Sequence, residues 1–65
     1  MDIGKGVKKA RESKGMTQRE LAEKIYVDTT LICKWEKGKK RVLAYELIAI
    51  LEILGMSLDE FKNMC

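Results

Sequence analysis

The 65-residue chain has room for a single domain, residues 1–65, and its 46% hydrophobic and 35% charged residues are typical of a folded protein. The absence of proline favours helices. The chain has no histidine, and its two cysteines do not have the spacing of metal ligands, so we expect that it binds no metal or cofactor and is not an enzyme. The net charge of +3 is unevenly distributed: residues 1–41 contain 12 Lys/Arg and 6 Asp/Glu, whereas residues 42–65 contain one Lys and four acids. This asymmetry fits a polyanion bound by one side of the protein and a chance distribution equally well.

The first predicted helix runs from residue 3 to residue 14. Its apolar stripe consists of Ile3, Val7 and Ala10. Gly4 and Gly6 weaken the first turn, where we expect fraying. Three later glycines follow amphipathic stretches and predict left-handed helix ends; they are Gly15, Gly38 and Gly55.

Two capping boxes predict where the second and fifth helices begin. Thr17 precedes Glu20 by three residues, and Ser57 precedes Glu60 by the same interval. A hydrophobic staple accompanies each box, formed by Met16 with Leu21 and by Met56 with Phe61. Two boxes with their staples indicate that the helix boundaries between them are correctly placed.

The second and third predicted helices lie close together in the sequence. The second ends near Ile25, and the third begins after Asp28 as its N-cap and ends before Gly38. About three residues separate them, which predicts a tight helix-turn-helix over residues 17–37. The buried positions of such a unit are filled by Leu21, Ala22, Ile25, Val27, Ile32 and Trp35.

A polar face remains on the third predicted helix once its buried positions are removed. Its members share one side and are Thr29, Thr30, Cys33, Lys34 and Lys37. Short side chains near a helix start, with longer lysines behind them, suit a helix end placed in the major groove of DNA. An ordinary solvated face would contain the same residue types, so this pattern needs support from the rest of the chain.

The fourth predicted helix, residues 44–54, carries more apolar residues than one buried face needs. The face expected to point toward the core holds Leu47, Ile48, Ile50, Leu51 and Leu54. The opposite face holds Tyr45, Ala49 and Ile53. We favour an interface with a partner over singly scattered surface hydrophobes, which are also common.

Four groups of residues keep a characteristic order and spacing. They are Gly15-Met16-Thr17-Gln18, Leu21-Ala22-Glu23-Lys24, Trp35-Glu36-Lys37-Gly38-Lys39-Lys40 and Leu54-Gly55-Met56-Ser57-Leu58-Asp59-Glu60-Phe61. In this spacing the chain resembles the lambda-repressor/Cro-like helix-turn-helix family (the xenobiotic-response-element type), without gaps from about Ile3 to Phe61. The resemblance implies a compact, all-α, five-helix DNA-binding domain of phage repressors and bacterial regulators, usually dimeric on palindromic operators.

The resemblance also implies a role for individual residues. Gln18 matches a position that touches a phosphate and braces the recognition helix. The positions that face bases are Thr29, Thr30, Cys33 and Lys34. The positions that clamp the DNA backbone after the recognition helix are Lys37, Lys39 and Lys40. Arg11 and Glu36 match a structural pair that ties the first helix to the end of the third.

This chain departs from the family pattern at four positions. Tyr26 stands in the turn where the family usually has glycine, so either Tyr26 takes a positive φ or the turn adjusts. Val42 stands where proline is common, which predicts a looser loop. Cys33 replaces a small polar or charged residue at a base-facing position, and Leu31 occupies a position that is often polar.

These features lead to competing functional hypotheses. The first is a transcriptional repressor that binds double-stranded DNA as a homodimer on a palindromic operator, with its third helix in the major groove. The dimer interface candidates are Tyr45, Ile53 and Met64. The alternative is an antitoxin or adaptor that binds a protein on the same fold, and the basic segment 34–41 favours DNA over it. A redox-responsive regulator would depend on Cys33 alone.

The sequence also predicts where the protein acts. No apolar run is long enough to span a membrane, and no signal peptide opens the chain. Two cysteines are too few for a disulfide scaffold, which fits a reducing compartment. We therefore expect a cytoplasmic protein with no membrane partner and no small-molecule ligand.

Overall fold

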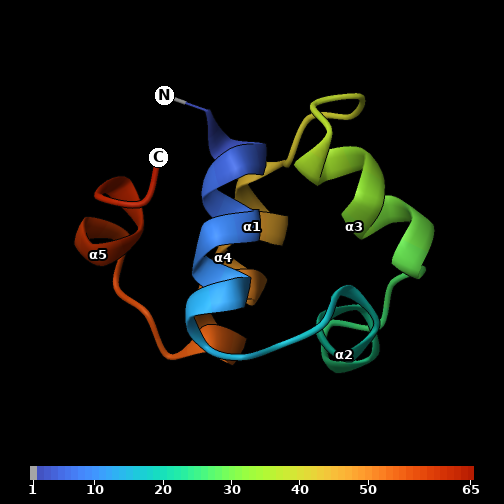
Figure 1. The fold of residues 1–65 in the computed structure, drawn as a ribbon, viewed down its shortest axis with the longest axis horizontal. Coiled ribbons are helices and arrows are strands. Elements are labelled where there is room, and N and C mark those ends of the chain that lie inside the picture. The colour runs from blue at the N-terminus through green and yellow to red at the C-terminus, as the bar shows by residue number, and fades with distance from the viewer. Residues whose placement is uncertain (1) are drawn as a thin grey trace.

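The computed structural model describes residues 2–65, which form five helices joined by short turns (Figure 1). The helices are α1 (Ile3–Ser13), α2 (Gln18–Lys24), α3 (Thr29–Glu36), α4 (Ala44–Leu54) and α5 (Leu58–Lys62). No strand occurs between residues 2 and 65. The predicted all-α, five-helix fold is therefore confirmed.

Local capping interactions determine where the helices begin. Both predicted capping boxes form: the Thr17 hydroxyl accepts from the Glu20 amide at 3.1 Å, and the Glu20 carboxylate accepts from the Thr17 amide at 2.9 Å. Ser57 and Glu60 exchange the same two hydrogen bonds at the start of α5. Asp28 caps α3 as predicted, by accepting from the Thr30 amide.

The start of α4 has a different cap, which the sequence analysis did not identify. Leu43 precedes this helix and has no side-chain acceptor, so it cannot satisfy an amide of the first turn. The carboxylate of Glu46 accepts from the Leu43 backbone amide at 2.8 Å. This is half of a capping box, and it holds the loop that leads out of α3 against the start of α4.

Four helices end in the same left-handed turn. In each, the amide after the left-handed residue donates to a carbonyl five residues back, as Val27 does to Ala22 at 3.0 Å. The predicted glycines occupy three of these positions, with φ between 63° and 72°; they are Gly15, Gly38 and Gly55. Tyr26 occupies the fourth with φ 59°. The turn after α2 therefore keeps its geometry, and Tyr26 takes the positive φ.

The core is assembled around α1, which packs against α3, α4 and α5. Figure 1 shows α1 and α4 between α5 on one side and the α2–α3 pair on the other. The largest fully buried side chains come from all five helices and are Val7, Leu21, Ile32, Trp35, Ile50 and Phe61. Both staples join this core, since Leu21, Met56 and Phe61 are buried and Met16 packs against them.

Gly4 and Gly6 have a packing role in α1 that sequence reasoning missed. A Cβ atom on Gly4 would overlap the backbone carbonyl oxygen of Trp35, and one on Gly6 would overlap the Cys65 sulfur and the Phe61 ring. We expected these glycines only to weaken the first turn. They also let α1 approach α3 and α5 closely, and Asp2 caps the turn by accepting from the Lys5 amide at 3.0 Å.

The expected orientation of α4 is wrong at one residue. Ile48 was placed on the core face, but its side chain is 57% exposed. The core takes the narrower stripe of Ile50, Leu51 and Leu54, with Leu47 half-buried beside it. Ile48 lies at the edge of that stripe and is left facing solvent.

Candidate nucleic-acid interface

The α2–turn–α3 unit is held together by its buried residues. Leu21 and Ala22 from α2 and Ile32 and Trp35 from α3 are almost completely inaccessible to solvent. Ala22 is buried on the side of α2 that faces the core, where a larger side chain would push the two helices apart. The turn residues Ile25 and Val27 are half-buried and pack against the same core, so α3 is supported along its inner side.

The outer side of α3 presents the residues predicted to face bases. Thr30 and Lys34 are exposed, whereas Thr29 and Cys33 are half-buried at the edge of the same side. Their spacing along the helix places all four on one face. Leu31 is half-buried and packs against the core, which explains an apolar residue at a position that is often polar.

The predicted backbone-contacting lysines gather at the end of α3. Lys39 and Lys40 donate their amides to the Lys34 carbonyl at 2.8 and 3.3 Å, so the loop folds back over the end of the helix. Lys37 is exposed with them, as is Arg41, which the sequence analysis placed only within the basic segment. Val42 packs against the core and anchors this loop without the usual proline.

Arg11 and Glu36 form the predicted pair between α1 and α3. Arg11 Nε lies 2.8 Å from Glu36 Oε2, and the two side chains are 9% and 3% exposed. Arg11 Nη2 donates to Glu36 Oε1 at 3.1 Å, and Nη1 donates to the Met16 carbonyl at 2.7 Å. The hydrogen bond to Glu36 raises the pKa of Arg11, although burial acts in the opposite direction. The guanidinium therefore joins three segments of the chain.

Gln18 belongs to the same buried network. Its Nε2 donates to Glu36 Oε1 at 3.0 Å, so the start of α2 is bonded to the end of α3. The bracing role implied for Gln18 has a direct counterpart here, and its partner is a carboxylate that the sequence analysis had paired with Arg11 alone. The two residues lie 18 positions apart, and no local pattern predicts this contact.

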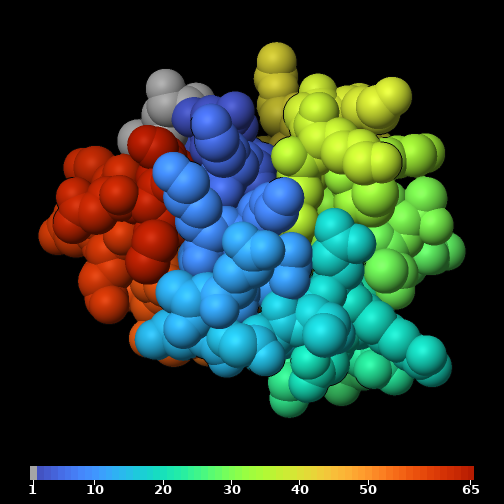
Figure 2. Space-filling model, in the orientation of Figure 1, coloured from blue at the N-terminus to red at the C-terminus, as the bar shows by residue number. Residues whose placement is uncertain are grey.

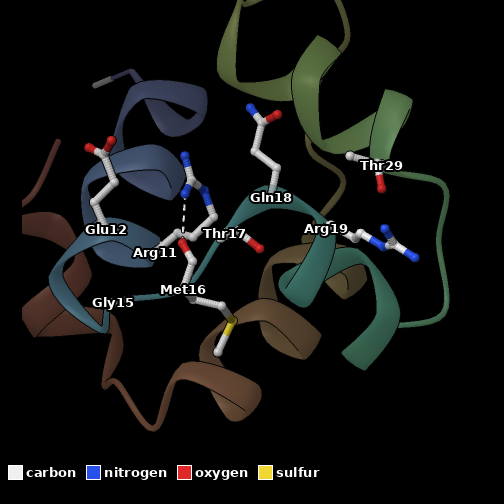
Figure 3. Close-up of a pocket in the computed structure, with 8 residues that line it drawn as sticks. All are labelled: Arg11, Glu12, Gly15, Met16, Thr17, Gln18, Arg19 and Thr29. Atoms are coloured by element: carbon white, nitrogen blue, oxygen red, sulfur yellow. Dashed lines mark hydrogen bonds between the residues drawn. The ribbon is translucent and has the colours of Figure 1, made fainter.

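An open depression of about 540 Å³ lies beside this network, where α1, α2 and α3 meet. Figure 3 shows its lining, with Gln18 rising from the start of α2 and Thr29 at the start of α3. Arg19, the next residue of α2, also lines the depression and is exposed, but sequence reasoning did not single it out. Its position directly after Gln18 in the sequence could have identified it as a candidate site residue. Figure 2 shows that α1, the start of α2 and the loop after α3 share one face of the molecule.

The three predicted dimer-interface residues differ in exposure. Tyr45 is 69% exposed and Ile53 is 40% exposed. Met64 is half-buried and packs against the core, so less of it is available to a partner. Within α4 and α5, two further large apolar residues are exposed, Ile48 on α4 and Leu58 at the start of α5. We call the exposed large apolar residues of α4 and α5, Tyr45, Ile48, Ile53 and Leu58, the rear apolar surface.

Residues 2–65 contain no cluster of three or more His, Cys, Asp or Glu side chains arranged to hold a metal ion. None of the helices in this range is both long enough and apolar enough to cross a membrane.

A buttressed α3 with an outward polar face and a basic loop at its end defines a helix-turn-helix DNA-binding domain. Residues 7–61 match the helix-turn-helix family, and the chain belongs to this family in its lambda-repressor/Cro-like form. It is a family of DNA-binding regulators rather than enzymes.

The chain is similar to a curated protein, the HTH-type transcriptional activator BcrR of Enterococcus faecalis. The two are 35% identical over 63 residues, which cover 97% of this chain and 31% of the relative. The chain therefore spans about a third of the length of that protein.

Proposed function

We propose that this domain binds double-stranded DNA sequence-specifically, with α3 in the major groove, and thereby regulates transcription. The observation that carries the proposal is the outer face of α3, where short polar side chains precede exposed lysines on a helix supported by the core. Such a face reads base edges in the major groove, while the basic loop behind it holds the phosphates.

The proposal assigns different roles to the two groups of residues. Thr29, Thr30, Cys33 and Lys34 contact base edges, with Lys34 donating to guanine O6 or N7 and a threonine methyl packing on a thymine methyl. The DNA backbone is contacted by Lys37, Lys39 and Lys40, together with Gln18. Lysines release counterions when they neutralise phosphates, but the neutral Gln18 contributes only hydrogen bonds.

Two matched lysine variants test this assignment. On a site selected from random DNA, Lys34→Ala should cost about 1–3 kcal/mol and relax the preference at one base pair. Lys39→Ala should weaken binding to all sequences similarly and reduce the slope of log affinity against log salt by about 0.9. Equal losses on selected and random DNA would make Lys34 a phosphate contact. A wild-type protein that selects no sequence would refute specific binding altogether.

We propose repression as the simplest regulatory outcome, because a protein bound across a promoter blocks transcription by occupancy alone. The Enterococcus faecalis relative is described as an activator, and the region matched here is about a third of it. A reporter gene tests whether the protein represses or activates transcription, with the selected site placed either within the promoter or upstream of it. Increased expression from the upstream arrangement would support activation and contradict repression.

We further propose that the domain works as a homodimer on a palindromic operator, through the rear apolar surface. A single recognition helix contacts only a few base pairs, and so short a site recurs too often in a genome to be specific. Two copies related by two-fold symmetry would read successive major grooves about 34 Å apart.

A further inference from the structure

The side-chain amide of Gln18 is oriented by the buried carboxylate of Glu36. Glu36 Oε1 accepts from Gln18 Nε2 at 3.0 Å and from Arg11 Nη2 at 3.1 Å. The other carboxylate oxygen accepts from Arg11 Nε at 2.8 Å, and the Arg11 guanidinium is itself bonded to the Met16 carbonyl. Because Glu36 is only 3% exposed and held by two donors of one guanidinium, its oxygens present a fixed acceptor to Gln18.

This arrangement determines which edge of the Gln18 amide is available to DNA. An ionised carboxylate only accepts hydrogen bonds, so the nitrogen of the amide has to point toward Glu36. One N–H of Gln18 is used in that bond, and the second N–H and the carbonyl oxygen remain. A glutamine without such a partner would present either edge and would lose rotational freedom only on binding.

We propose that Glu36 is a positioning residue for the DNA contact of Gln18, and this inference rests on the proposed function. Glu36 does not touch DNA itself. It holds the amide so that the second N–H lies ready to donate to a phosphate oxygen before the complex forms. Arg11 supports this role by holding the carboxylate in place.

A double-mutant cycle on DNA affinity tests the proposal. We expect Gln18→Ala to weaken binding about fivefold, and Glu36→Gln to weaken it about threefold when Gln18 is present. In the Gln18→Ala background, Glu36→Gln should weaken binding no further. If Glu36 only stabilised the fold, its substitution would change affinity by the same factor in both backgrounds, and that result would overturn the proposal.

The cycle also separates positioning from charge. Glu36→Gln removes a negative charge, which by itself strengthens attraction to a polyanion in both backgrounds equally and cancels in the cycle. Each variant is compared at a temperature where circular dichroism shows it to be folded. Wild-type protein that fails to bind DNA would refute the proposed function, whereas binding with no loss in Gln18→Ala would refute this inference alone.

NMR relaxation of the side-chain amide nitrogens in the wild-type protein gives a second test, which does not depend on any variant being folded. Gln18 and Asn63 carry the two side-chain amides of the chain, and Asn63 is exposed near the C-terminus. We expect the Gln18 amide to be as rigid as the backbone in the free protein, and the Asn63 amide to be mobile on the picosecond–nanosecond timescale. Equal mobility of the two amides would show that Glu36 does not position Gln18.

Discussion

Tyr26 has a strained backbone that its side chain does not offset. Its φ of 59° lies in the left-handed region, where a residue with a Cβ atom is about 1–2 kcal/mol less stable than in a right-handed conformation. The side chain is 94% exposed, so packing contributes little in return. Glycine occupies the equivalent position at the end of α1, α3 and α4.

Tyr26→Gly should therefore stabilise the domain by about 0.5–1 kcal/mol. Relief of the left-handed strain exceeds the added backbone freedom that glycine has in the unfolded chain. Urea unfolding measures the change. Gly15→Ala is the matched control, because φ there is 67° and no atom crowds the added Cβ, so a loss of about 1 kcal/mol is expected from backbone strain alone. A wild-type midpoint for Tyr26→Gly would indicate that the tyrosine makes a compensating contact.

At the scale of single elements, α2 and α5 depend on their caps. They contain 7 and 5 residues, too few to be stable as isolated helices, so their stability comes from capping and from docking onto the core. The backbone amides of Thr17 and Ser57 donate to Glu20 and Glu60, and these bonds hold the pKa of each carboxyl below the ordinary glutamate value.

The two capping glutamates should make stability depend on pH in the acid range. A carboxyl whose pKa is lower in the folded state stabilises the fold above its unfolded pKa, about 4.3, and this contribution is lost as the pH falls through the folded value. Glutamine fills the same capping position but does not titrate. We therefore expect the melting temperature of the wild type to fall more steeply below pH 5 than that of Glu20→Gln/Glu60→Gln.

Thermal melts between pH 7 and pH 3 check this difference. Glu23→Gln is a matched control, because Glu23 is an exposed acid of α2 that lies outside the capping box. Its curve should run parallel to that of the wild type. If the double variant also runs parallel, the capping carboxylates do not contribute to acid unfolding.

At the scale of the whole molecule, the Arg11–Glu36 pair links α1 to the end of α3. Arg11→Met should cost about 3–5 kcal/mol, because it leaves the Glu36 carboxylate buried without its charged partner. Small domains are stable by only about 5–15 kcal/mol, so much of the stability would be lost. Arg11→Met/Glu36→Leu should recover most of it, since no buried charge remains. Urea unfolding of both variants measures the effect, and a single variant within 1 kcal/mol of wild type would contradict it.

The rear apolar surface predicts how two copies associate. It lies on α4 and α5, within residues 42–65, which carry more acids than bases and are therefore repelled by DNA phosphates. We expect Ile53→Asp to prevent the second copy from binding a palindromic site and to lower affinity there. Ile53→Leu keeps the apolar surface and should bind as the wild type does.

Stoichiometry on DNA, with sedimentation of the free protein, decides this prediction. Two chains per palindromic site are expected for the wild type and for Ile53→Leu. A small interface that forms only on the operator would give a monomer in free solution and a dimer on DNA. One chain per site, or Ile53→Asp binding as tightly as wild type, would refute the dimer.

The helix boundaries and most of the core were predictable from the sequence, because their signals are local. A capping box spans four residues, as in Thr17–Glu20, and the left-handed ends at Gly15, Gly38 and Gly55 depend on a single residue type. The apolar spacing of α3 likewise identified Ile32 and Trp35 as buried. The outward positions of α3 followed from the same spacing, so most of the candidate interface could be located.

Only the tertiary structure decided how the elements meet. Residues far apart in the chain meet in the close approach at Gly4 and Gly6 and in the hydrogen bond from Gln18 to Glu36. The exposure of Ile48 and the partial burial of Met64 depend on which neighbouring helix covers each residue. The sequence around a helical glycine looks the same whether the glycine weakens a turn or allows another helix to pack closely against it. The physical reason is that packing is a long-range property, set by the crossing of helices, whereas caps and periodicity act within one or two turns.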